Sequence, residues 1–150
     1  MREILFRGKR LYNGDWVYGN LVIDKNDKPH IVPKDYFYED GHHLKYYDDT
    51  DKPVFIDPVT VGQYTGLTDK NGTKIFEGDI VNYPDTYLSW SGDVDVKGNV
   101  GAVEWSKITM CFYFSNRIAV DMEEFFVLNG CMTDVEVIGN IHDNPELIGG

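Results

Sequence analysis

The chain has 150 residues, of which 42% are hydrophobic and 14% aromatic, and its formal net charge is -11 at pH 7. This length allows one domain or two very small ones, and the composition excludes an intrinsically disordered chain. The charge is uneven, with net -2 over residues 1–57 and net -9 over residues 58–150. Because nucleic-acid backbones and anionic membranes are themselves negative, an acidic surface disfavours binding to either.

The ends and the cysteines point to a reduced, soluble protein. The opening residues contain no apolar run of signal-peptide length, and nowhere do about eighteen apolar residues follow one another. Cys111 and Cys131 are too few and too far apart for a disulfide framework. We therefore expect a cytoplasmic protein whose two cysteines are small apolar residues.

Most of the chain has the pattern of β-strands. Apolar and polar residues alternate, or β-branched residues are dense, in several segments separated by turn residues such as Asn13-Gly14 and Asn71-Gly72. These segments are Ile4–Arg7, Asp15–Ile23, Val54–Ile56, Asp79–Tyr83, Val100–Trp105, Thr109–Phe114 and Val135–Ile141. Such short strands with frequent turns predict a small barrel or sandwich.

A cluster of basic residues lies near the start of the chain, at Arg2, Arg7, Lys9 and Arg10. We interpret it as the solvated edge of a strand, where charge prevents edge-to-edge aggregation. The alternative is a nucleic-acid-binding arm, which the acidic remainder of the chain makes less favourable.

Three other segments are expected to be irregular or helical. The acidic and aromatic stretch between Pro33 and Pro53 is predicted to pack on the body of the protein or on another subunit. Asp85–Gly98 is predicted to be a mobile loop. Short helices are predicted at Asp121–Leu128 and after Asn144, where an N-cap residue precedes a proline.

Carboxylates and histidines suggest chemistry in three places, but the spacing supports none of them well. The loop that contains Glu39, Asp40, His42, His43, Asp48, Asp49 and Asp51 has metal-ligand residue types without a metal-ligand spacing. The turns at Asp24–Asp27 and Asp69–Gly72 lack the register of a calcium loop and are interpreted as hairpin turns. No nucleophile–histidine set and no phosphate-binding glycine loop is present.

Glu77 and Asp79 flank Gly78 and could act as paired carboxylates in acid and base chemistry. The alternative is that one of them accepts backbone N–H groups and shapes the turn, and we favour this structural role. If a ligand surface exists, we expect it beside Gln63, Tyr64, Thr65, Glu77 and Asp79, although Tyr64 also suits a core. We expect no catalytic residue, metal or cofactor.

Three motifs together indicate a family. VGQYTGLTDKNGTKIFEGDI at residues 61–80, VEVIGNIHDNPEL at residues 135–147 and the opening MREILFRG resemble the YopX family of phage and prophage proteins. The resemblance implies a mainly β protein of uncharacterised function in a bacterial host cell, with an SH3-type barrel roll at residues 58–150. A β-rich segment at residues 1–57 would pack on this barrel, with few short helices.

The sequence thus predicts a non-catalytic phage accessory protein that acts by binding or assembly, as a homo-oligomer, with a host or phage protein as a further partner. One alternative is a metal-dependent hydrolase or nuclease that uses acidic residues. Another is an acidic mimic of nucleic acid that occupies a basic host protein.

Overall fold

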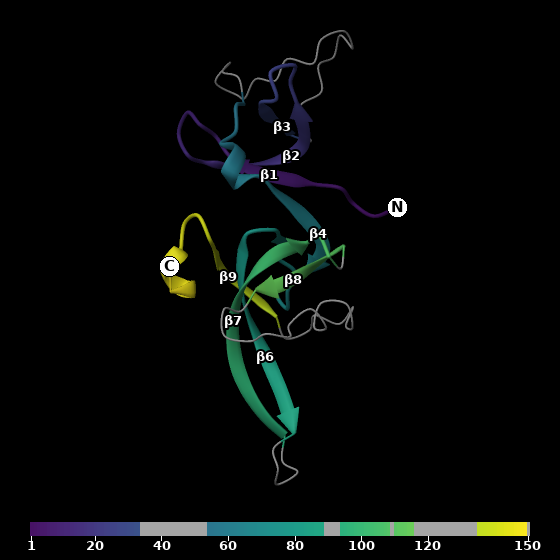
Figure 1. Ribbon diagram of the computed structural model, residues 1–150, viewed down its shortest axis with the longest axis vertical. Coiled ribbons are helices and arrows are strands. Elements are labelled where there is room, and N and C mark those ends of the chain that lie inside the picture. The colour runs from purple at the N-terminus through teal and green to yellow at the C-terminus, as the bar shows by residue number, and fades with distance from the viewer. Residues whose placement is uncertain (34–53, 89–93, 109, 116–134, 150) are drawn as a thin grey trace. The chain divides into compact units, whose positions relative to one another are not determined.

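A computed structural model describes residues 1–33, 54–88, 94–108, 110–115 and 135–149 (Figure 1). The chain forms two compact units, Met1–Tyr64 and Thr65–Gly150. The described residues form antiparallel sheets with two short 3-10 helices, so the prediction of a mainly β protein is confirmed. No helix in these ranges is long and apolar enough to cross a membrane.

The N-terminal unit is built on β1 (Phe6–Lys9), β2 (Trp16–Ile23), β3 (Pro29–Pro33) and the start of β4 (Gly62–Thr68). These strands are antiparallel in the order β3-β2-β1-β4. The first residues of β2 alternate between buried and exposed positions, as a strand with one covered face requires. Buried side chains of this unit form one core, made by Val17, Ile31, Val54 and Ile56.

Strand β1 is not an edge strand, so the interpretation of its basic residues as a solvated edge is wrong. β4 returns from far along the chain and pairs with β1 at Phe6 and Arg7. Arg7 is buried, and its guanidinium carbon lies 4.6 Å from the centre of the Trp16 ring. An aromatic face attracts a cation, which explains how this strand carries a buried arginine.

Val54–Ile56, predicted as a strand, contributes two isolated bridges, His30 with Phe55 and Arg10 with Ile56. The chain then enters η1 (Pro58–Thr60), where the Asp57 carboxylate accepts the Val59 N–H at 3.2 Å. The domain boundary predicted after Asp57 falls at the start of this helix, inside the first unit.

The C-terminal unit holds the rest of β4, together with β5 (Lys74–Phe76), β6 (Asp79–Leu88), β7 (Val94–Ser106), β8 (Cys111–Ser115) and β9 (Glu136–Asn140). The last four strands form an antiparallel sheet in the order β8-β7-β6-β9. A separate core lies here, made by Ile75, Val81, Val103, Phe112 and Val135. The strands suit an SH3-like arrangement, but they do not close into a barrel in the part of the chain that the structure describes.

The mobile loop predicted at Asp85–Gly98 is wrong over most of its length. Residues 85–88 and 94–98 lengthen the β6–β7 ladder, which runs in register from Ile80 and Ala102 to Leu88 and Val94. The segment Lys97–Asn99, whose glycine and asparagine are typical of turns, also pairs within this ladder. Glycine and asparagine indicate turns only where no partner strand supplies hydrogen bonds, and β6 supplies them here.

The family motif at residues 61–80 contains two strands that the sequence did not predict, β4 and β5. Residues 63–67 lie in β4, where Gly66 has a φ of 90°. The two following turns are as expected, and Gly78 reaches a φ of 85° between Glu77 and Asp79. Residues with a side chain rarely adopt such positive φ angles, so glycine suits both positions.

Only one of the two predicted helices lies in the described ranges. Pro145 opens the 3-10 helix η2 (Pro145–Ile148), which confirms the helix start after Asn144. Asn144 does not cap it with its side chain; its Oδ1 accepts the Asn140 N–H at 3.3 Å instead. The helix predicted at Asp121–Leu128 lies outside the described residues.

Candidate binding pocket in the N-terminal unit

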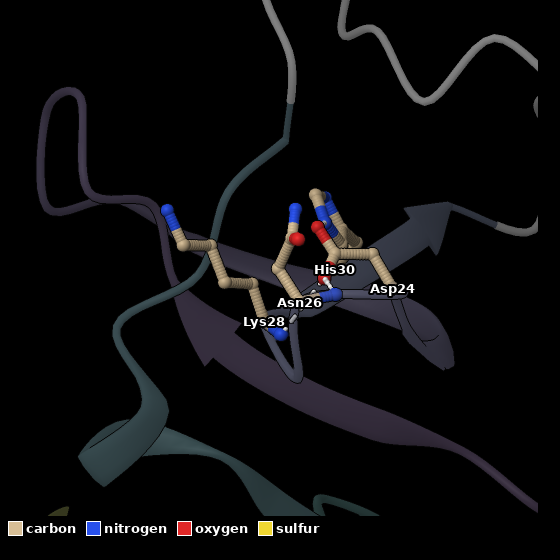
Figure 2. Close-up of polar contacts among 4 residues, drawn as sticks. All are labelled: Asp24, Asn26, Lys28 and His30. Atoms are coloured by element: carbon tan, nitrogen blue, oxygen red, sulfur yellow. Dashed lines mark hydrogen bonds and ion pairs between the residues drawn. The ribbon is translucent and has the colours of Figure 1, made fainter.

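The hairpin between β2 and β3 is shaped by the side chain of Asp24 (Figure 2). Its Oδ1 accepts the backbone N–H of Asn26 at 2.7 Å and that of Lys28 at 3.0 Å. The Asp24 N–H in turn donates to the Lys28 carbonyl at 3.0 Å. Aspartate is common in turns because its short side chain can accept hydrogen bonds from nearby backbone N–H groups. The predicted hairpin turn is therefore confirmed.

The other carboxylate oxygen of Asp24 lies 3.0 Å from Nε2 of His30, whose side chain is buried at the start of β3. This hydrogen bond, followed by the one from the Lys28 N–H, lowers the pKa of Asp24 to about 2. Asp24 therefore stays a carboxylate at any ordinary pH, and it fixes the imidazole of His30 against the hairpin.

His30 connects this turn to a segment that is distant in sequence. Its ring centre lies 4.7 Å from that of Phe55, with the two planes tilted by 49°, and the backbones of the two residues form a β-bridge. Such tilted pairs of rings are favourable. The contacts from Asp24 to His30 and from His30 to Phe55 thus hold the Phe55 ring in place.

Phe55 forms part of the wall of an open pocket of about 540 Å³. The pocket lies between the connection from β1 to β2, the end of the Asp24 turn and the chain that leads into η1. Its described lining is almost entirely apolar and consists of Leu11, Tyr12, Lys28, Pro29, Phe55, Ile56 and Pro58. Leu11 and Tyr12 are more than 60% exposed, whereas Ile56 belongs to the core.

Lys28 is the only charged residue in the described lining of the pocket. Figure 2 shows its side chain extending away from the carboxylate of Asp24. Within the described ranges its ammonium group forms no ion pair, while its backbone is fixed by Asp24. An apolar cavity with a single cationic group at its wall is a feature of small-molecule sites.

Sequence reasoning placed the candidate ligand residues elsewhere. Gln63 and Tyr64 lie in β4 at the end of the first unit, where Gln63 pairs with Phe6. Tyr64 is buried, and its N–H donates to the Leu5 carbonyl at 2.8 Å. The expectation that Tyr64 suits a core is confirmed, and neither residue is among those that line the pocket.

The other three predicted residues belong to the second unit. Thr65 is buried, with its hydroxyl donating to the Ile75 carbonyl at 2.9 Å. Asp79 is 2% exposed, and its Oδ2 accepts the Phe76 N–H at 2.8 Å. The structural interpretation of the turn is therefore confirmed for Asp79. Glu77 is half-buried beside it, and a ligand role for these residues stays a prediction.

Asp69 is a further buried carboxylate with a structural role, in the turn between β4 and β5. Its Oδ1 accepts the N–H groups of Asn71 and Thr73, and its Oδ2 accepts the N–H of Val137 in β9 at 3.0 Å. Burial alone would raise the pKa of Asp69, but these three backbone donors outweigh burial and lower it. The Asp-Lys-Asn-Gly motif is a hairpin turn, as predicted, and it also anchors the hairpin to β9.

The metal-type residues of the acidic loop, from Glu39 to Asp51, lie outside the described residues, as does Cys131. Within the described ranges, no group of three or more histidine, cysteine, aspartate or glutamate residues is placed to hold a metal ion.

The pocket itself was missed by sequence reasoning, although a signal for it existed. Leu11 and Tyr12 are large and apolar, and they directly precede the Asn13-Gly14 turn, where side chains point to solvent. Lys28 and Phe55 gave no such signal, because only the bridge between His30 and Phe55 brings their segments together.

Comparison with known proteins places the chain in context. A family model described as "YopX protein" matches residues 5–149. The chain is also similar in structure to protein EF1440 from Enterococcus faecalis, known from a crystal structure, with a TM-score of 0.58, 24% sequence identity and 99% of each chain covered. That likeness shows the fold alone. No curated protein matches the chain.

Proposed function

The chain belongs to the YopX family, and on that premise we propose that it is a phage or prophage accessory protein that acts by binding and not by catalysis. Its binding site is the apolar pocket of the N-terminal unit. The family assignment covers nearly the whole chain, so the pocket lies within the family region.

The pocket carries this proposal. Its volume of about 540 Å³ lies within the range typical of ligand sites, and its walls are apolar. Leu11 and Tyr12 are each more than 60% exposed. Adjacent exposed apolar side chains around a concave surface are characteristic of a surface that meets a partner or ligand.

The acidic residues support binding over catalysis. Asp24, Asp69 and Asp79 each accept at least one backbone N–H and thereby shape a turn. A carboxylate in such a turn cannot take up a proton during a reaction without weakening the hydrogen bonds that it accepts. These three aspartates are therefore poorly suited to general acid and base chemistry.

The binding proposal is tested by recovering the tagged protein from bacteria in which the prophage is induced. Leu11→Glu places a charge at the pocket wall, and we expect it to abolish recovery of the partner that the wild type retains. Ile23→Glu is the matched control, since Ile23 is also an exposed apolar residue of this unit but does not line the pocket. Equal recovery by wild type and Leu11→Glu would contradict a role for the pocket.

We also propose that the protein is a homo-oligomer. Support comes from the C-terminal unit, where large apolar side chains are exposed at Trp105 near the end of β7 and at Ile108 and Met110 in the connection to β8. Light scattering should give a multiple of the chain mass of 17.2 kDa, and Ile108→Lys should lower it. A monomer mass over a wide concentration range would remove this proposal.

A further inference from the structure

We infer that the pocket of the N-terminal unit binds a small aromatic carboxylate, with the ring against Tyr12 and Phe55 and the carboxylate at the ammonium group of Lys28. This inference rests on the proposed function, because it names the ligand of the same site. It follows from four properties of the pocket: its size, the chemistry of its wall, its charge and its rigidity.

The size suits a compact organic molecule. A cavity of about 540 Å³ exceeds the volume of a single amino-acid side chain and lies in the lower half of the range, roughly 300–1,000 Å³, that is typical of small-molecule sites. A compound with a single ring or with two fused rings would fit within it.

The wall favours a ring over a flexible chain. Two aromatic residues, Tyr12 and Phe55, and two prolines, Pro29 and Pro58, contribute to the lining. Aromatic rings prefer offset or edge-on contact with other rings, which a ligand ring can satisfy. Flat ligands also lose little conformational freedom on binding, because they have few rotatable bonds.

The charge selects a single anionic group. Lys28 is the only charged residue of the described lining, and within those ranges its ammonium forms no ion pair. The Asp24 carboxylate does not neutralise it, because Asp24 faces His30 and the backbone of the turn (Figure 2). One ammonium matches one carboxylate, whereas a phosphate group is usually held by several donors or by arginine.

The pocket is held in shape before any ligand arrives. The backbone of Lys28 is fixed by two hydrogen bonds with Asp24, and the Phe55 ring packs on His30, which Asp24 orients. A site whose walls are already ordered pays little entropy when it binds, so a small ligand can gain measurable affinity.

The test uses two compounds of the same shape, naphthalene-2-carboxylate and naphthalene-2-methanol, titrated calorimetrically into the full chain. We expect the carboxylate to bind roughly five-fold more tightly than the alcohol, the upper range for an ion pair near a surface. Lys28→Gln should remove this preference. Lys25→Gln should keep it, because Lys25 is an exposed lysine of the same turn that does not line the pocket.

The outcomes separate this inference from the proposed function. Equal affinity of the wild type for both compounds, or a preference that survives Lys28→Gln, would overturn the carboxylate assignment and leave the pocket as a binding site. Binding of neither compound would overturn the inference of an aromatic carboxylate but not the proposed function, which the recovery of a partner from induced cells tests. Binding unchanged in Leu11→Glu would count against the pocket and thus against both. Weaker binding of both compounds to Leu11→Glu, with a preference that depends on Lys28, supports both.

Discussion

Several aspartates of this chain serve the backbone of turns. Asp24, Asp69 and Asp79 each sit within a few residues of the N–H groups that they accept, at distances of 2.7–3.0 Å. The carboxylate of Asp69 also reaches the N–H of Val137, far along the chain. Asp69 and Asp79 are themselves buried, and backbone groups shielded from water must find partners, so these two side chains contribute stability that an exposed acidic residue would not.

Replacing Asp69 by asparagine should lower the free energy of unfolding by about 1–3 kcal/mol. The amide has one acceptor oxygen in place of two, so at least one partly buried N–H group loses its partner. Denaturant titration measures the loss. Asp27→Asn is the control, because Asp27 is exposed with a φ of 58°, which asparagine also tolerates. An equal loss in both variants would contradict the special role of Asp69.

Acid should weaken this contribution. The pKa values of Asp24 and Asp69 are both lowered in the folded protein, that of Asp24 from 3.8 to about 2. A lowered pKa adds stability that is complete above the unfolded value and disappears as pH falls through the folded value. We therefore expect the difference in unfolding free energy between wild type and Asp69→Asn to narrow from pH 5 to pH 2.5. A difference in unfolding free energy that stays constant with pH would show that the charge of Asp69 does not contribute to stability.

At the scale of elements, the central position of β1 in its sheet determines how closely the N-terminal unit packs around this strand. β1 pairs with β2 on one side and with β4 on the other. The Ile56 side chain packs against β1 at Gly8. Gly8 lies in this strand, and a Cβ atom placed there would collide with the side chain of Ile56. The glycine is therefore required for close packing, not for backbone flexibility.

Gly8→Ala should lower the free energy of unfolding by about 1–3 kcal/mol, because the Ile56 side chain must move out of a tightly packed core. A double-mutant cycle with Ile56→Ala isolates the cause. The cost of Gly8→Ala should be smaller in the Ile56→Ala background, since the colliding atoms are gone. Additive effects of the two substitutions would contradict a direct clash.

At the scale of the whole molecule, the chain forms two compact units with separate cores. The pocket belongs to the first unit, and the buried Asp69 and Asp79 belong to the second. Residues 58–150 carry a net charge of -9. Two of their carboxylates, Asp69 and Asp79, accept hydrogen bonds from backbone N–H groups of the same unit. The exposed acids that remain affect long-range electrostatics and solubility.

The proposed binding function uses no metal ion, so it predicts that divalent ions do not stabilise the protein. We expect magnesium or manganese to leave the melting temperature unchanged, because only an ion that binds the folded state raises stability. Thermal unfolding with chelator and with added ion measures this. A clear rise that disappears in Glu77→Gln/Asp79→Asn would favour the metal-dependent hydrolase instead.

Turns and a helix start could be predicted from the sequence where neighbouring residues alone set the backbone angles. Asn71-Gly72, Glu77–Asp79 and the proline after Asn144 have the predicted turn or helix start, because adjacent residues set the backbone angles there. The loop predicted within residues 85–98 failed, since pairing with a partner strand overrode the local turn residues. Three strands of the first sheet, β3, β4 and β5, were not predicted, because only their pairing with partner strands shows them to be strands.

The sequence by itself determined the family, the mainly β class and the structural nature of Asp69 and Asp79, because local turn chemistry and specific motifs carry that information. Only the tertiary structure decided where β1 lies and what forms the pocket. Leu11, Lys28 and Phe55 are separated in the chain, and they meet because backbone bridges join Arg10 to Ile56 and His30 to Phe55. A site made by such long-range pairing depends on which strands meet, and no local pattern specifies that.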